Sequence, residues 1–157
     1  MNKLKILIID DEPSICSALK MALQREGYSV ETALSGKVGL NILKNSTPDA
    51  VILDLRLPDT DGMYILKKIK EFSDNVIVIV ISAFGDTKTA VEAVKRGAYD
   101  FITEPFDLNE IKLSLERALR ERELETEKKL LKLNQKKVIF ITRDKRMFDI
   151  LSQVDAL

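Results

Sequence analysis

The 157-residue chain contains no histidine and only one cysteine, Cys16. Without histidine, His-based catalytic triads, histidine metal ligands and a phosphohistidine donor within the chain are all excluded. A single cysteine excludes an internal disulfide bond and fits a reducing compartment such as the cytoplasm. Because Cys16 lies in a helical pattern, we interpret it as an inert thiol of the core.

The sequence also lacks an excess of either charge and any long apolar run. Lysine plus arginine and aspartate plus glutamate each number 25, so the net charge indicates neither nucleic-acid nor membrane binding. The longest apolar run, residues 76–81, is much too short to span a membrane, and residues 1–5 lead into a strand pattern without a signal peptide. The 45% hydrophobic and 32% charged residues indicate a soluble protein with one domain of ordinary size.

Apolar runs alternate with amphipathic segments through the first 120 residues. The six consecutive β-branched residues at 76–81 are typical of a strand covered by helices on both faces. In the segment 86–96 we expect a helix with Ala90, Val91 and Val94 facing the core. Five such units predict an α/β fold with a doubly wound parallel sheet, followed by an extended C-terminal helix. The expected strands are residues 4–9, 30–33, 50–53, 76–81 and 99–103, and the expected helices start near residues 13, 38, 63, 86 and 107.

Acidic residues follow two of these strands: Asp10 and Asp11 after the first, Asp54 after the third. If the two strands are neighbours, they lie roughly 4.8 Å apart, and two ionised carboxylates about 5 Å apart repel by roughly 3 kcal/mol at an effective dielectric near 20. Such a cluster predicts a bound Mg²⁺, or Mn²⁺ in its place, and an aspartate able to act as a nucleophile toward phosphorus. The alternative is that each aspartate caps a helix or a turn.

Four segments resemble the receiver domains of two-component response regulators, in the same order and at fitting separations. They are ILIIDDEP at 6–13, VILDLRLPDTDG at 51–62, VIVISAFGD at 78–86 and GAYDFITEPF at 97–106. The resemblance covers residues 3–120 and implies a sheet with the strand order 2-1-3-4-5, as in flavodoxin and CheY.

The resemblance also implies roles for residues at the strand ends. Asp54 would accept a phosphoryl group from a partner histidine kinase. Asp11, Asp54 and the backbone carbonyl of Arg56 would hold Mg²⁺, with Asp10 helping through water. Because the metal neutralises charge on the transferring phosphoryl group, it supplies much of what a protein contributes to this step. The chain would then be a regulatory phosphoacceptor rather than an enzyme.

The same resemblance assigns a switch to the last two strands, with one departure from the family pattern. Ser82 would donate a hydrogen bond to the phosphoryl group, and Phe101 would turn inward when Ser82 moves. Glu104 stands where the family has a lysine that pairs with the aspartate and the phosphoryl group. Three readings follow: Glu104 turns out to solvent and phosphorylation is only slowed; it joins the metal shell; or the domain is a pseudo-receiver that acts by dimerisation or protein contact without phosphorylation.

Beyond the receiver-like part, residues 121–137 predict a helical linker, either a solvated connector or a short coiled coil. Leu124 and Leu131 keep a seven-residue interval, but Arg117 occupies the position one heptad earlier. We expect the chain to form a homodimer through the last helix and this linker. Residues 138–157 are expected to start a truncated downstream domain, and KVIFIT at 137–142 is expected to form a strand. One helical face is expected to follow, made of Met147, Ile150, Leu151 and Val154.

The order of these parts resembles transcriptional activators similar to nitrogen regulatory protein C, in which an AAA+ ATPase and a DNA-binding domain follow the receiver. DKRMFDILSQVDAL at 144–157 resembles the helix that opens such an ATPase, but the chain has no Walker A motif and no evident recognition helix. Two rivals remain. The first is a haloacid-dehalogenase-type phosphatase, which would need a second acid two residues after Asp54, where Arg56 stands. The second is a flavodoxin-like flavin-binding protein, but the acidic DDEPS loop after the first strand would repel the phosphate of the flavin.

Overall fold

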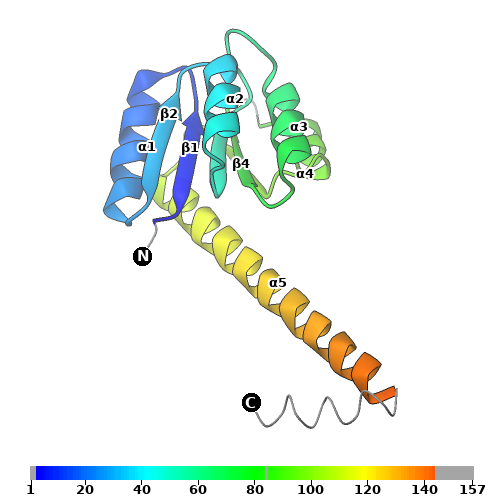
Figure 1. Cartoon of the computed structure of the whole chain (residues 1–157). Coiled ribbons are helices and arrows are strands. Elements are labelled where there is room, and N and C mark those ends of the chain that lie inside the picture. The colour runs from blue at the N-terminus through cyan, green and yellow to red at the C-terminus, as the bar shows by residue number, and fades with distance from the viewer. Residues whose placement is uncertain (1–2, 84, 144–157) are drawn as a thin grey trace. The chain divides into compact units, whose positions relative to one another are not determined.

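The computed structural model describes residues 3–83 and 85–143, and these form a five-stranded sheet with five helices (Figure 1). The strands pair in the order β2-β1-β3-β4-β5, and all four pairings are parallel. The expected fold class and strand order are therefore confirmed. The strands are β1 (Lys5–Ile9), β2 (Ser29–Ala33), β3 (Ala50–Asp54), β4 (Ile77–Ser82) and β5 (Asp100–Thr103). The helices are α1 (Pro13–Arg25), α2 (Gly36–Asn45), α3 (Gly62–Phe72), α4 (Thr87–Lys95) and α5 (Leu108–Arg143).

Helices cover both faces of the sheet because the strands are apolar on both faces. Alternate residues of a strand point to opposite faces, so Ile6 and Ile8 of β1 pack into one core and Leu7 and Ile9 into the other. The first core also contains buried residues of α1 and of α5 up to Leu119, and the second contains buried residues of α2, α3 and α4. Figure 1 shows α2 and α3 together over one face of the sheet. This double cover leaves the carboxyl ends of the strands as the place where polar groups emerge.

Helix α4 is rotated relative to the expected orientation. Val91 and Val94 are 47% and 52% exposed, so the prediction that they face the core was wrong. Ala93 is fully buried instead, and Ala90 is partly buried. The smaller alanine side chains let the helix backbone lie close to the sheet, and the bulkier valines therefore remain at the surface. Periodicity identified the helix but not which of two adjacent apolar stripes faces inward.

The strand expected at residues 137–142 is also wrong, because α5 continues as one helix to Arg143. No glycine or proline interrupts the sequence from Leu108 to Arg143, and extending an existing helix adds one hydrogen bond for each residue fixed. A strand has to find a partner strand before its β-branched residues gain anything from packing. The helical face expected at residues 147–154 lies outside the described residues.

The chain divides into two compact units, the first ending at Leu119 and the second beginning at Arg120. Both packed cores belong to the first unit, since Leu119 is the last residue in either of them. In the second unit, Leu124 and Leu131 are 53% and 61% exposed. Within the described part of the chain, no helix is both long enough and apolar enough to pass through a membrane.

Candidate functional site

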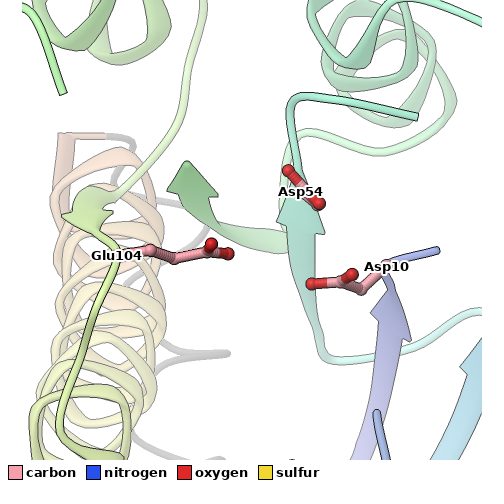
Figure 2. A group of neighbouring side chains, drawn as sticks. All are labelled: Asp10, Asp54 and Glu104. Atoms are coloured by element: carbon pink, nitrogen blue, oxygen red, sulfur yellow. The ribbon is translucent and has the colours of Figure 1, made fainter. Parts of the chain in front are cut away.

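Three carboxylates meet where β1, β3 and β5 end. Asp10 follows β1 directly, Asp54 is the last residue of β3, and Glu104 follows β5. Because β1 and β3 are adjacent, with Ile9 opposite Leu53, Asp10 and Asp54 emerge side by side. Each of the three acids offers a carboxylate oxygen, and these oxygens lie within 4.8 Å of one another. Figure 2 shows Glu104 reaching from the segment after β5 toward the two aspartates.

Backbone hydrogen bonds fix the carboxylates of Asp10 and Asp54 and the main chain of Glu104. Asp10 donates its N–H to the Ala33 carbonyl (3.0 Å), and its Oδ1 accepts a hydrogen bond from the Glu12 N–H (2.9 Å). Asp54 Oδ1 accepts from the Arg56 N–H at 3.0 Å, and Asp54 is only 8% exposed. Glu104 donates its N–H to the Ser82 carbonyl at 2.8 Å, next to a cis Glu104–Pro105 peptide bond. The chain thus holds the acids together at the sheet edge.

One oxygen in the pocket lacks a partner. Asp10 is fully buried, and its Oδ2 has no hydrogen-bond partner among the described residues. Burial of an ionised carboxylate without a partner destabilises the folded state by roughly several kcal/mol. A divalent cation placed among the three carboxylates would satisfy this oxygen and offset their mutual repulsion. The donor set, made of oxygen alone, fits a hard cation such as Mg²⁺ or Mn²⁺.

The pKa values of Asp10, Asp54 and Glu104 are all raised, which indicates that no nearby positive charge among the described residues offsets the negative charge of these acids. Burial raises the pKa of Asp10 to about 7, the Glu12 N–H opposes this, and the charges of Asp54, Glu104 and Asp11 add to the rise. Burial is also the main reason why the pKa of Asp54 and that of Glu104 are raised. Every charged side chain that shifts these three pKa values by its charge is acidic. In the absence of a cation, Asp10 therefore retains its proton up to about neutral pH.

The other residues singled out from the sequence lie around this pocket. Asp11 is exposed and is not one of the three clustered acids, although its charge contributes to the raised pKa of each. Ser82 is buried at the end of β4, one residue beyond Ile81, which pairs with Asp54. The Arg56 side chain is exposed, and its backbone adjoins Asp54. Phe101 is half-buried and packs against the core formed with α2, α3 and α4.

Glu104 does not have the outward orientation that was one of its three readings. Its side chain is partly buried and faces Asp54 and Asp10. Glu104 lies near the two aspartates because it directly follows β5. This strand pairs with β4, and β4 pairs with β3, so the carboxyl ends of β3 and β5 lie at the same edge of the sheet. Sequence reasoning identified Glu104 as unusual and placed it at a strand end. The direction of its side chain depends on the path of the backbone after Thr103, which no motif specifies.

A second contact at this edge, made by Asp59, was missed by the sequence analysis. The Asp59 carboxylate accepts hydrogen bonds from the Gly36 and Lys37 N–H groups, both at 2.9 Å. These are donors at the start of α2, which otherwise have no partner within the helix. Thr60 packs so closely on Gly36 that a Cβ there would overlap its methyl group. The loop after Asp54 is therefore fixed to α2.

Asp61 and Gly62 secure the other end of that loop. Asp61 caps α3 by accepting a hydrogen bond from the Met63 N–H at 3.0 Å. Gly62 donates its N–H to the Leu55 carbonyl at 3.0 Å, and a Cβ on Gly62 would overlap the Leu55 backbone. Only glycine allows this approach without a shift of the chain. The loop between Asp54 and α3 is thus held at both ends.

Residues 6–116 match the family model described as response regulator receiver domain. Among curated proteins, regulatory protein AtoC of Escherichia coli strain K12 is 35% identical over 123 residues, which are 78% of this chain and 27% of that protein. This chain thus spans about a quarter of the length of that relative.

Solved structures agree with this match. NtrX of Brucella abortus superimposes with a TM-score of 0.78 at 35% identity, covering 83% of this chain and 30% of that one. The BeF₃-activated receiver domain of DrrB superimposes with a TM-score of 0.71 at 29% identity, covering 76% of this chain and 99% of that one. The compared segments thus agree in both sequence and fold.

Proposed function

Because this chain belongs to the response regulator receiver domain family, we propose that Asp54 accepts a phosphoryl group from a partner histidine kinase. By family the domain is regulatory rather than catalytic. The observation that supports the proposal best is the position of Asp54 at the end of β3, nearly buried and next to the fully buried Asp10, whose Oδ2 has no hydrogen-bond partner among the described residues. Such an arrangement suits a phosphoacceptor that works with a divalent cation.

In the transfer, an oxygen of the Asp54 carboxylate forms a bond to phosphorus while the bond between phosphorus and the donor nitrogen breaks. The Arg56 N–H already binds Asp54 Oδ1 and so orients the carboxylate for this attack. Asp10, Asp11, Asp54 and the Arg56 carbonyl are the groups that would hold Mg²⁺, with Mn²⁺ acceptable in its place. The cation supplies positive charge against the oxygens of the transferring group.

The switch is assigned to the neighbouring strands. We propose that the Ser82 hydroxyl donates a hydrogen bond to a phosphoryl oxygen and that Phe101 then turns inward. The burial of Ser82 one residue beyond the partner of Asp54 supports the first role. The half-buried position of Phe101 on the adjacent strand supports the second.

Phosphorylation is tested by incubating the protein with a small phosphodonor and Mg²⁺ and measuring the intact mass. We expect one phosphoryl adduct that Asp54→Asn abolishes. Asp74→Asn, a change at an exposed aspartate, serves as the matched control and should leave the adduct in place. Absence of any adduct at saturating donor would refute the phosphoacceptor role.

The output is proposed from the relatives and from α5. We propose that the receiver belongs to an activator similar to nitrogen regulatory protein C, that it acts in the cytoplasm, and that it controls downstream ATPase and DNA-binding domains absent from this chain. Control would pass through a homodimer formed by α5 and the linker. The exposure of Leu124 and Leu131 supports a helix face that pairs with a second copy. Sedimentation with and without beryllofluoride should show a change in oligomeric state, and one unchanged state would argue against this coupling.

A second candidate function is a pseudo-receiver that dimerises without phosphorylation. The observation in its favour is Glu104, which adds negative charge where an incoming phosphoryl group would sit. The mass measurement described above separates the two functions. If there is no adduct and the protein is still a dimer, the pseudo-receiver is correct.

A further inference from the structure

We propose that Glu104 is a ligand for the divalent cation, so that three carboxylates hold the ion and the pocket favours the cation-loaded, unphosphorylated state. This inference concerns the pocket of the proposed function and rests on it for the role of Asp54. It adds a metal ligand from the opposite side of the pocket. It also states that this ligand favours binding of the cation over acceptance of the phosphoryl group.

The geometry of the three acids supports direct ligation by Glu104. The ligand oxygens of Asp10, Asp54 and Glu104 lie within 4.8 Å of one another, so a single ion can contact all three at usual metal–oxygen distances of about 2.1–2.5 Å. Two acids come from the adjacent strands β1 and β3, and the third reaches in from beyond β5 (Figure 2). An ion between them would therefore be enclosed from two sides.

An independent observation indicates that the three acids bind an ion and are not simply solvated by water. Asp10 is fully buried, and its Oδ2 lacks a hydrogen-bond partner among the described residues. Its other oxygen is already used by the Glu12 N–H. A buried oxygen of this kind requires a partner, and the acidic side chains clustered with Asp10 are those of Asp54 and Glu104. Both of these are acceptors when ionised, so a cation is the partner that satisfies all three.

The charge of the pocket sets the preference between its two ligands. Asp10, Asp54 and Glu104, with the nearby Asp11, carry a formal charge of about −4 when ionised. A divalent ion reduces this charge, whereas a phosphoryl group on Asp54 makes it more negative. Glu104 therefore strengthens binding of the ion and weakens acceptance of the phosphoryl group at the same time. Three carboxylates leave fewer positions for water than Mg²⁺ usually keeps, which makes Mn²⁺ the more suitable probe.

The experiment measures Mn²⁺ binding to the whole chain by the electron paramagnetic resonance signal of free Mn²⁺. Glu104→Gln keeps the shape and removes the charge, while Glu104→Asp keeps the charge and shortens the reach. Glu12→Gln is the matched control, because the Glu12 charge also raises the pKa of Asp54 and Glu104 but its carboxylate is not one of the clustered three. The extent of phosphorylation by a small phosphodonor is measured on the same variants.

For direct ligation we expect both Glu104 variants to weaken Mn²⁺ binding by about tenfold or more, and Glu12→Gln by clearly less. Glu104→Gln should also raise the extent of phosphorylation at fixed Mg²⁺. A loss of binding together with a gain of phosphorylation cannot come from misfolding. If Glu104→Gln binds Mn²⁺ as the wild type does, or if it weakens binding no more than Glu12→Gln, the inference is overturned.

The same data separate this failure from failure of the proposed function. Asp54→Asn and Asp11→Asn are measured alongside. If they abolish Mn²⁺ binding and Glu104→Gln does not, the receiver function stands and the role of Glu104 falls. If no acidic variant in the pocket affects Mn²⁺ binding, the proposed function itself loses its cation and falls with the inference.

Discussion

Asp10 differs from the other acids of the pocket in being fully buried, and its titration is coupled to folding. Its pKa rises from 3.8 to about 7 on folding, because burial disfavours the charged form. Protonated Asp10 therefore stabilises the folded state relative to ionised Asp10. This contribution is fully present below pH 3.8 and is lost as the pH rises through about 7.

The first prediction is that, in a chelator, the free energy of unfolding decreases between pH 5 and pH 8 by about 2–4 kcal/mol relative to Asp10→Asn. The asparagine variant has no charge to bury, so its stability should change much less in that range. Urea denaturation at several pH values measures both proteins. Added Mg²⁺ at pH 8 should restore stability to the wild type and not to the variant. Parallel pH profiles for the two proteins would contradict the assignment.

At the residue scale, the sequence anticipated that Asp10 and Asp54 lie close together, because each stands at the carboxyl end of an apolar strand whose neighbour could be anticipated. It placed Asp11 in the metal shell by resemblance, and the structure leaves that role a prediction, since Asp11 is exposed outside the three clustered acids. The partners of Asp59 could not be anticipated. Asp59 lies 23 residues from Gly36 in the sequence, and only the packing of two loops brings them together.

At the scale of elements, the loop after Asp54 and the helix α2 behave as one piece because Asp59 caps a helix to which it does not belong. The N–H groups of Lys37 and Gly36 hold the pKa of Asp59 below its ordinary value. This capping contribution is present above pH 3.8 and is lost as the pH falls through the lower pKa of the folded state. The position of the loop after Asp54 and the integrity of α2 are therefore linked.

The second prediction is that Asp59→Ala speeds hydrogen exchange of the Gly36 and Lys37 amides and leaves the start of α3 unchanged. The reason is that both amides lose their only capping acceptor from the loop. Asp61→Ala is the matched control, because Asp61 caps Met63 of α3, and it should give the opposite pattern. Exchange measured by NMR resolves the individual amides. Unchanged exchange at both amides in Asp59→Ala would refute the link.

The elements also show where periodicity is sufficient and where it fails. All five strands were anticipated to within one residue at each end, because an apolar run has to be covered on both faces wherever it lies. The inward face of α4 was not, since alanines and valines alternate along it and packing distance decides between them. The helical state of residues 137–142 was missed because propensity acts locally, whereas helix extension depends on the preceding turns.

At the scale of the whole molecule, the residues that stabilise the fold lie in the first unit, residues 1–119. Every residue of the two packed cores precedes Arg120. The part of α5 after Arg120 contributes exposed leucines and charged residues instead, so it adds little to the stability of the sheet.

The third prediction is that a fragment of residues 1–120 unfolds with the stability of the whole chain to within about 0.5 kcal/mol. The fragment retains both cores, including Leu115 and Leu119. It should also be a monomer, because Leu124 and Leu131, the exposed residues that support the proposed dimer, lie beyond it. Urea denaturation and sedimentation equilibrium measure the two properties. A strongly destabilised fragment would show that the linker supports the sheet, and a dimeric fragment would place the contact elsewhere.

The position of Cys16 gives this molecule a built-in reporter. Its thiol is 4% exposed, donates to the Asp10 carbonyl with a sulfur–oxygen distance of 3.3 Å, and has a pKa raised to about 11 chiefly by burial. A thiol reagent can therefore reach it only when α1 separates from the sheet. The rate of thiol modification then measures how often α1 separates from the sheet next to Asp10, and no cysteine has to be introduced. Comparison of the rates with and without a divalent ion shows how far the ion suppresses this separation.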